Sequence, residues 1–215
     1  MQIEPKTDIL GLVDVQPTFM PGGELAIVGG DEVVPTINGL LQQFPCAFAT
    51  QDWHPVDHTS FAVQHPGHAP YDVIDMPYGK QVLWPTHAVA GSANAALHAD
   101  LDQTRIAIVV RKGMHHDIDS YSAFFENDRT TPTGLDGWLR QRGFGRIFLA
   151  GLATDFCVAW TAEDARRLDY DVFVIEDACR GIGLPTDSGR TTLDDARNRL
   201  KSLGVSFISS ADLAV

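Results

Sequence analysis

The sequence predicts an α/β fold in three layers, in which a mostly parallel β-sheet carries helices on both faces. Short apolar runs without polar alternation recur along the chain, as is typical of strands buried on both sides. Segments with apolar residues at helical spacing lie between most of these runs, and this alternation indicates strands joined by crossover helices. The length of 215 residues and the lack of a linker favour a single domain over residues 1–215.

Six apolar runs are the expected strands, and the segments between them supply the expected helices. The strands are DILGLVDV (8–15), CAFATQ (46–51), RIAIVVRK (105–112), RIFLAGLA (146–153), DVFVIEDA (171–178) and VSFISSADL (205–213). The helices are expected over residues 30–44, 92–101, 133–143, 154–170 and 187–204. Ser92 is a candidate helix N-cap, and the segments that end at 143 and 204 each close on a glycine.

Residues 53–91 interrupt this alternation. They contain five prolines and show no clear helix or strand pattern. A loop of this length inside a compact domain is usually functional. We therefore expect residues 53–91 to bind a metal and a substrate.

Charge and cysteine content limit the partners and the location of the chain. The net charge of −12 describes an acidic surface, which repels phosphate, so nucleic acid is not an expected partner. No basic signal segment opens the chain, and no apolar run approaches the ~20 residues that span a bilayer. The three cysteines are widely spaced, which favours free thiols in a reducing compartment. We expect a cytoplasmic protein with no membrane partner.

Three polar residues follow three of the expected strands. Asp14, Lys112 and Cys157 each lie at or just beyond a carboxyl end, the edge at which open α/β sheets bind ligands. Taken singly, the aspartate fits a turn, the lysine a solvated edge charge and the cysteine inert packing. Taken together, the aspartate and the lysine can neutralise each other, because unpaired buried charge is costly.

Cys157 has the features of a nucleophile. It falls in the first turn of the expected helix 154–170, where the helix N-terminus and a nearby cation favour a thiolate. A neighbouring carboxylate can accept the thiol proton, so Asp14, Lys112 and Cys157 are compatible with acyl transfer. Cys46 begins a strand at the opposite edge and Cys179 follows a strand in a loop, so we expect both to be structural.

The stretch QDWHPVDHTSF (51–61) is a candidate metal site. In extended chain, Asp52 and His54 project to the same side, as two ligands of one ion should. Carboxylate with imidazole suits Zn, Fe, Mn or Ni better than Ca or Mg. Alternatively, the aspartate caps a turn and the histidines are surface residues. A further ligand would come from the same stretch or the loop, which together offer His58, His65, His68 and His87.

Several segments match one known family in order and spacing, over about residues 8–183. The most specific are QDWHPVDHTSF, LWPTH and GLATDFCV, with VDVQPTF, VVRKG and DSYSAF between or around them. On these motifs the chain resembles the nicotinamidases of the isochorismatase-like cysteine hydrolase superfamily. The resemblance implies a six-stranded, Rossmann-like sheet flanked by helices.

The resemblance also implies a role for individual residues. It implies a catalytic triad of Asp14, Lys112 and Cys157. It implies an oxyanion hole formed by the backbone N–H groups of Ala153 and Cys157, with a cis peptide before Ala153. The implied metal ligands are Asp52, His54 and His87, with His58 nearby, and the implied substrate contacts are Phe19, Trp84 and Tyr121.

The expected activity is hydrolysis of the small molecule nicotinamide to nicotinate and ammonia, through a cysteine thioester, in NAD salvage. One divalent transition metal, zinc in preference to iron or manganese, would anchor the pyridine nitrogen. Family members often form homo-oligomers. The alternative is another cysteine amidase of the superfamily, acting on pyrazinamide, a ureido compound or an N-carbamoyl compound. A nucleotide-binding module is disfavoured, because no GxGxxG follows the first strand.

Overall fold

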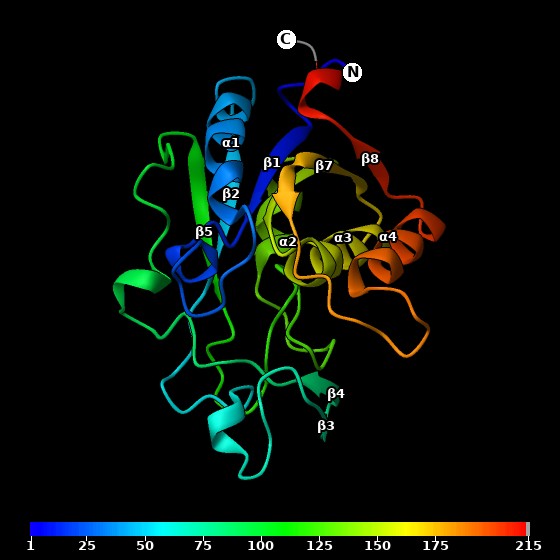
Figure 1. Ribbon diagram of the computed structural model, residues 1–215. Helices are drawn as coiled ribbons and strands as arrows, with labels where there is room; N and C mark the ends of the chain where they lie inside the picture. Colours follow the sequence, from blue (N-terminus) through cyan, green and yellow to red (C-terminus); the bar gives the residue numbers. More distant parts are fainter. Residues whose placement is uncertain (214–215) are drawn as a thin grey trace.

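The computed structural model describes residues 1–213, and its centre is a six-stranded sheet with the order β5-β2-β1-β6-β7-β8 (Figure 1). Every neighbouring pair in this sheet is parallel. The strands are β1 (Asp8–Val13), β2 (Ala47–Asp52), β5 (Ile106–Lys112), β6 (Arg146–Leu152), β7 (Asp171–Arg180) and β8 (Ser206–Ile208). The prediction of a parallel α/β sheet is confirmed.

Four α-helices flank the sheet, as predicted for a three-layer fold. They are α1 (Val33–Leu41), α2 (Leu135–Gln141), α3 (Ala159–Arg167) and α4 (Thr192–Ser202). Helix α1 packs against β7, β6 and β1, whereas α3 packs against β7 and against α4 (Figure 1). No helix within residues 1–213 is long and apolar enough to cross a membrane.

The end of the chain differs from the prediction. The expected strand over 205–213 is limited to β8, and a 3-10 turn, Ser210–Asp212, follows it. The Ser209 hydroxyl accepts a hydrogen bond from the N–H of Ala211, and the Asp212 carboxylate accepts one from the N–H of Ser209. These side chains offer the backbone an alternative to the sheet, which ends the strand early. In contrast, β7 is longer than expected, so Cys179 lies in a strand and not in a loop.

The prediction of a helix over residues 92–101 is wrong. Only a 3-10 turn, Ala93–Ala95, forms there, although Ser92 does cap it by accepting a hydrogen bond from the N–H of Ala95. The Ala95 carbonyl instead accepts the side-chain amides of Gln16 at 2.8 Å and Gln51 at 2.9 Å. Because these tertiary bonds occupy that carbonyl, it is not used to continue a helix.

Residues 53–91 contain more regular structure than the sequence suggested. The antiparallel hairpin of β3 (Val73–Met76) and β4 (Gly79–Val82) lies in this region, together with a 3-10 turn, Ala62–Gln64. The two strands alternate only weakly between exposed and less exposed positions, which explains why their pattern was missed. The Pro77–Tyr78 turn before Gly79 was the available signal.

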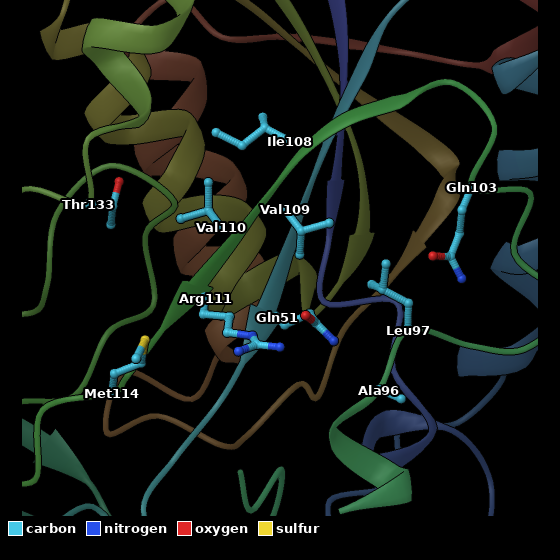
Figure 2. Close-up of a pocket in the computed structure, with 10 residues that line it drawn as sticks. All are labelled: Gln51, Ala96, Leu97, Gln103, Ile108, Val109, Val110, Arg111, Met114 and Thr133. Carbon is cyan, nitrogen blue, oxygen red and sulfur yellow. The ribbon is translucent and has the colours of Figure 1, made fainter. Parts of the chain in front are cut away.

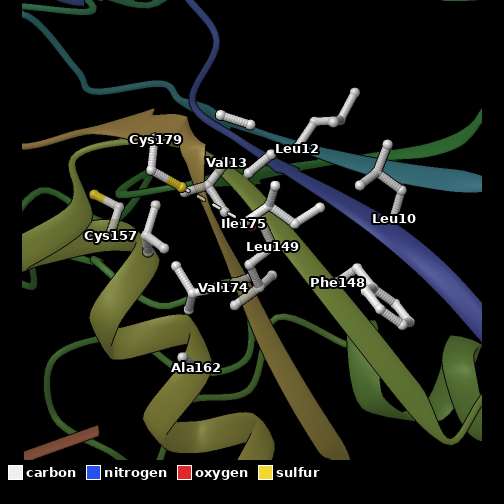
Figure 3. Close-up of a cluster of buried hydrophobic side chains, with 14 of the residues drawn as sticks. Leu10, Leu12, Val13, Phe148, Leu149, Cys157, Ala162, Val174, Ile175 and Cys179 are labelled. Atoms are coloured by element: carbon white, nitrogen blue, oxygen red, sulfur yellow. Dashed lines mark hydrogen bonds between the residues drawn. The ribbon is translucent and has the colours of Figure 1, made fainter. Parts of the chain in front are cut away.

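The two central strands carry the core and lead to the site. Every residue of β1 is buried, as are all but the first of β6 (Figure 3). Figure 3 also shows the Cys179 sulfur directed to the Leu149 carbonyl, at 3.9 Å, and not to Cys157. The strand order changes direction between β1 and β6, and in α/β sheets a ligand crevice opens at such a point beyond the carboxyl ends.

Candidate active site

Asp14 follows β1 directly and is fully buried. Its φ of 48° turns the chain away from the sheet, so the carboxylate remains beyond the strand end. Thr50 Oγ1 accepts the Asp14 N–H at 3.1 Å and donates to Asp14 Oδ1 at 2.6 Å. Within the described chain, Oδ2 makes no hydrogen bond of good geometry, although it lies 2.8 Å from Lys112 Nζ. Oδ2 is therefore the oxygen available for a further proton.

Gln16 fixes the neighbouring strand end, a role that the sequence did not reveal. Its side-chain oxygen accepts the N–H of Asp52 at 2.8 Å, and its side-chain nitrogen donates to the Asp52 carbonyl at 2.9 Å. The amide thus pairs with both backbone groups of Asp52. This contact holds the end of β2 in place after β1 has left the sheet.

Lys112 joins two carboxylates. Strand β2 lies between β5 and β1, so the lysine is paired in register with Asp52 and reaches past it to Asp14. Its ammonium group forms ion pairs with both, and donates to the Ser120 carbonyl at 3.0 Å. Burial opposes the charge on Lys112, but Asp14 and Asp52 raise the pKa of this group well above its usual value. The pairing with Asp52 was not predicted.

Cys157 lies in a π-helical turn, Thr154–Val158, that connects β6 to α3. Its sulfur is 3.3 Å from Lys112 Nζ. Atoms of Asp14, Asp52 and Cys157 that could hold a cation or share a proton all lie within 4.8 Å of one another. The structure therefore brings together the three residues that the strand ends suggested.

Protonation differs between the thiol and the carboxylates. Burial raises the pKa of Cys157 well above its usual value and outweighs the opposing effect of Lys112, so the thiol needs a base, as the sequence suggested for Asp14. Burial also raises the pKa of Asp14, to about 6, against the lowering effect of Lys112. Asp52 differs, because Lys112 and two histidines overcome its burial and hold its pKa well below the usual range.

Asp52, His54 and His87 form a buried group able to hold a metal ion. The Asp52 Oδ2 atom is 3.7 Å from His54 Nε2 and 3.6 Å from His87 Nε2. The Nδ1 atoms face backbone carbonyls, that of Gly113 for His54 and that of Pro85 for His87, each at 2.9 Å. Each Nδ1 can thus keep its proton while Nε2 presents a lone pair beside the carboxylate, the arrangement of metal-binding histidines.

Gly113 allows the His54 ring to approach the backbone. A Cβ atom at this position would lie 2.3 Å from His54 Cε1, and the residue has a φ of +64°. Any larger side chain would displace the ring.

His58 lies outside this group. Its Nδ1 is 2.7 Å from Ser60 Oγ, and its Nε2 is 3.3 Å from the Ile118 carbonyl. With His54 and Asp119 it forms a second cluster, which shares one histidine with the first. Of the other histidines nearby, His68, His115 and His116 are exposed, whereas His65 is half-buried.

A small cavity connects the nucleophile to the metal-binding group. Phe19, Trp84 and Tyr121, the implied substrate contacts, all line it and are all buried. The Trp84 indole N–H donates to the Tyr121 hydroxyl at 3.1 Å, which fixes two of these rings relative to each other. Ala153, at the end of β6, also lines the cavity, and the expected cis peptide precedes it.

Four further lining residues were missed. They are Leu25, Asp119, Phe156 and Ile182. Phe156 belongs to the quoted motif GLATDFCV, and Asp119 stands two residues before Tyr121 in DSYSAF, so motif position could have identified both. Ile182 follows β7 at the carboxyl edge of the sheet, the same signal that indicated Asp14.

A larger hollow lies beside the edge strand β5, where Val109 and Val110 point to opposite sides of the strand (Figure 2). Its volume is about 680 Å³. None of its lining residues belongs to the triad or the metal-binding group. The chemistry is therefore concentrated in the smaller cavity.

Comparison with known proteins gives a consistent result. The family model described as Isochorismatase domain matches residues 9–208. A nicotinamidase of Acinetobacter baylyi is 48% identical over 95% of this chain and 93% of its own length. A nicotinamidase of Escherichia coli is 41% identical, with 94% of each chain covered.

Solved structures agree over nearly the whole chain. The Acinetobacter baumanii nicotinamidase/pyrazinamidase superposes with a TM-score of 0.93 at 47% identity, covering 98% of this chain and 99% of that one. An L. infantum protein in complex with nicotinate gives a TM-score of 0.85 at 38% identity, covering 100% and 98%. The Pyrococcus horikoshii pyrazinamidase in complex with zinc gives 0.74 at 30% identity, covering 94% and 98%.

Proposed function

The chain belongs to the isochorismatase family, and from that premise we propose that its buried site hydrolyses nicotinamide to nicotinate and ammonia. The observation that carries the proposal is the placement of Cys157, 3.3 Å from Lys112 Nζ and in the same cavity as the Asp52–His54–His87 group. Relatives named nicotinamidases support the substrate, as does the nicotinate in the L. infantum structure. A role in NAD salvage follows from this reaction.

In the first half of the reaction, Asp14 is the base. Its Oδ2 atom, which is free of good hydrogen bonds in the described chain, takes the proton from the Cys157 thiol. The sulfur attacks the carboxamide carbon, and the carbonyl π electrons move to oxygen. Lys112 stabilises the negative charge that passes between Asp14 and the sulfur. This order agrees with a buried thiol whose pKa is high and a nearby carboxylate whose pKa is about 6.

Two backbone N–H groups, those of Ala153 and Cys157, would receive the oxyanion. Such a donor is typically worth about 3 kcal/mol in the transition state. When the oxyanion collapses, the C–N bond breaks and Asp14 returns its proton to the leaving ammonia. Asp14 then removes a proton from water, whose oxygen attacks the thioester. The C–S bond breaks, Asp14 returns the proton to the sulfur of Cys157, and nicotinate leaves.

The residues present fit a divalent transition metal. One carboxylate and two imidazole nitrogens are a donor set that zinc, iron and manganese accept, and both Nδ1 atoms have the carbonyl partners that leave Nε2 free. A metal held by Asp52, His54 and His87 would act as a Lewis acid toward the pyridine nitrogen. We favour zinc, which the P. horikoshii relative binds.

Ammonia release from nicotinamide by purified, metal-loaded protein tests the proposed function. We expect activity in the wild type and none in Cys157→Ala. A panel with pyrazinamide, a ureido compound and an N-carbamoyl compound tests the substrate. A higher kcat/KM for any of these than for nicotinamide would contradict the assignment.

We further propose that the whole chain acts as one domain, in the cytoplasm, as a homo-oligomer. Limited proteolysis, cell fractionation and light scattering would test these three points separately.

A further inference from the structure

The cavity at the active site is narrow, since only about 20 Å³ is open to the centre of a water-sized sphere. Of the residues that line the cavity, all are buried except Ile182, which is half-buried. The side chain of Ile182 therefore lies where the cavity meets the surface.

Ile182 begins the loop from β7 to α4, and Asp155 holds it. Asp155 is buried, and its carboxylate accepts the N–H groups of Ile182 and Gly183, each at 2.9 Å. It also accepts the hydroxyl of Thr192, at the other end of the loop. One side chain therefore fixes both ends of the loop.

Asp155 belongs to the same π-helical turn as Cys157. The position of the nucleophile and the position of the loop thus depend on one short segment. Gly181 makes this contact feasible, because a Cβ there would lie 2.8 Å from Asp155 Oδ1 and 2.4 Å from Leu193 Cδ2. With any other residue at 181, the loop would be pushed away from the turn.

We infer that Ile182 determines which ring substituents the site accepts, and that Asp155 is a positioning residue that holds Ile182 over the cavity. The carboxylate of Asp155 contacts no reacting atom in this scheme. It acts through the backbone of residues 182 and 183. The identity of the amide rests on the proposed function, whereas control of access to Cys157 does not.

The first test measures specificity. In Ile182→Ala, the preference for nicotinamide over ring-methylated nicotinamides should fall about 10-fold or more, since one apolar group in a pocket is worth roughly that much. Leu184→Ala is the matched control, because Leu184 is on the same loop but does not line the cavity. Its preference should stay at the wild-type value. An unchanged preference in Ile182→Ala, or an equal fall in the control, would overturn the assignment of Ile182.

The second test measures access without catalysis. Cys157 is labelled with a small reagent, iodoacetamide, and a bulky one, N-phenylmaleimide, and mass spectrometry separates it from Cys46 and Cys179. The labelling ratio is the rate of labelling by N-phenylmaleimide divided by the rate of labelling by iodoacetamide. This ratio should rise in Ile182→Ala and in Asp155→Asn. Thr192→Val, which removes one of the three donors to Asp155, should give a smaller shift in the same direction.

The two tests separate the inference from the proposed function. If the wild type hydrolyses no nicotinamide, the proposed function fails, yet the labelling ratios still report on Ile182 and Asp155. If the wild type is active and folded Asp155→Asn and Thr192→Val both keep the wild-type labelling ratio, the positioning role of Asp155 is wrong. A ratio that shifts in both variants, in the order given, supports it.

Discussion

The two halves of the active site are built in different ways. Asp14 and Cys157 follow strands of the central sheet and Lys112 is the last residue of one, so the sheet brings them together. In the metal-binding half, Asp52 belongs to a strand, but His54 and His87 lie in the long segment after β2. In the proposed mechanism, the first half transfers protons and the second offers lone pairs to a metal ion.

Lys112 connects these halves, because it forms ion pairs with both Asp14 and Asp52. Its two partners nevertheless differ, since burial raises the pKa of Asp14 to about 6 whereas the pKa of Asp52 is held well below its usual range. The comparison teaches that one cation can lie between two carboxylates whose pKa values are shifted in opposite directions. It also predicts that a substitution in one half leaves the other half largely intact, whereas a substitution of Lys112 affects both.

The largest expected effect is the loss of the nucleophile. In Cys157→Ala, kcat should fall at least about 10⁴-fold, as is usual for the nucleophile of a covalent mechanism. Single-turnover assays measure the fall, and metal analysis should show an unchanged metal content. The control is Cys46→Ala, which lies outside the cavity and should keep full activity. A metal content that falls together with kcat would mean that the halves are not separable.

The next effect is removal of the shared cation. Lys112→Met leaves two buried carboxylates without their partner, and breaking a buried pair typically costs about 3–5 kcal/mol. We expect lower kcat, weaker metal binding and a lower Tm in the same variant, measured by assay, metal titration and calorimetry. Lys80→Met is the control, because its ion pair with Asp75 is exposed and should matter little. Normal metal binding in Lys112→Met would contradict the connecting role.

Removal of the metal-binding half should change substrate binding more than chemistry. In His87→Ala, KM for nicotinamide should rise about 100-fold, because a Lewis-acid contact is worth several kcal/mol. Steady-state kinetics on metal-loaded and chelator-treated protein measure the change, and chelation of the wild type should reproduce it. His68→Ala, an exposed histidine of the same segment, is the matched control. Equal changes in kcat and KM would show that the division into halves is too simple.

The smallest effect concerns pH. Asp14 must be ionised to accept the thiol proton, and burial raises its pKa to about 6, so the reactive form is lost as the pH falls through that value. We expect kcat/KM to decrease by about tenfold per pH unit below 6 and to be level just above it. A pH profile in buffers of constant ionic strength checks this. A profile that stays level down to pH 4.5 would exclude Asp14 as the base.

The sequence predicted well that Asp14, Lys112 and Cys157 lie together, because the carboxyl ends of the strands of a parallel sheet share one edge. It predicted the pair Asp52 and His54 from the two-residue period of extended chain, and both belong to the metal-binding group. His87 came only from the family resemblance, since nothing in residues 53–91 distinguishes it from the other loop histidines. Its selection depends on a tertiary contact, the bridge between His54 and Val89.

The contacts between the halves could not be predicted. The ion pair of Lys112 with Asp52 requires β2 to lie between β5 and β1, and strand order is not written in any local pattern. Ile182 lies near the carboxyl end of β7, which was an available signal, but its contact with the cavity also depends on how Asp155 holds the loop backbone. The raised pKa of Cys157 could not be predicted either, because it comes from burial, which is a property of the whole fold.

Gln16 has a consequence for transplanting this chemistry into another scaffold. Its side chain has the same donor and acceptor as a peptide group, and it bonds both backbone groups of Asp52, which a continued β1 would otherwise do. The side chain of Gln16 therefore continues the hydrogen bonding of the sheet beside β2. As a result, β1 can end at Val13, and Asp14 lies outside the strand. A graft limited to the reacting residues would leave the backbone N–H and C=O of Asp52 without these hydrogen-bond partners. The smallest portable unit of this site includes a residue that touches neither sulfur nor metal.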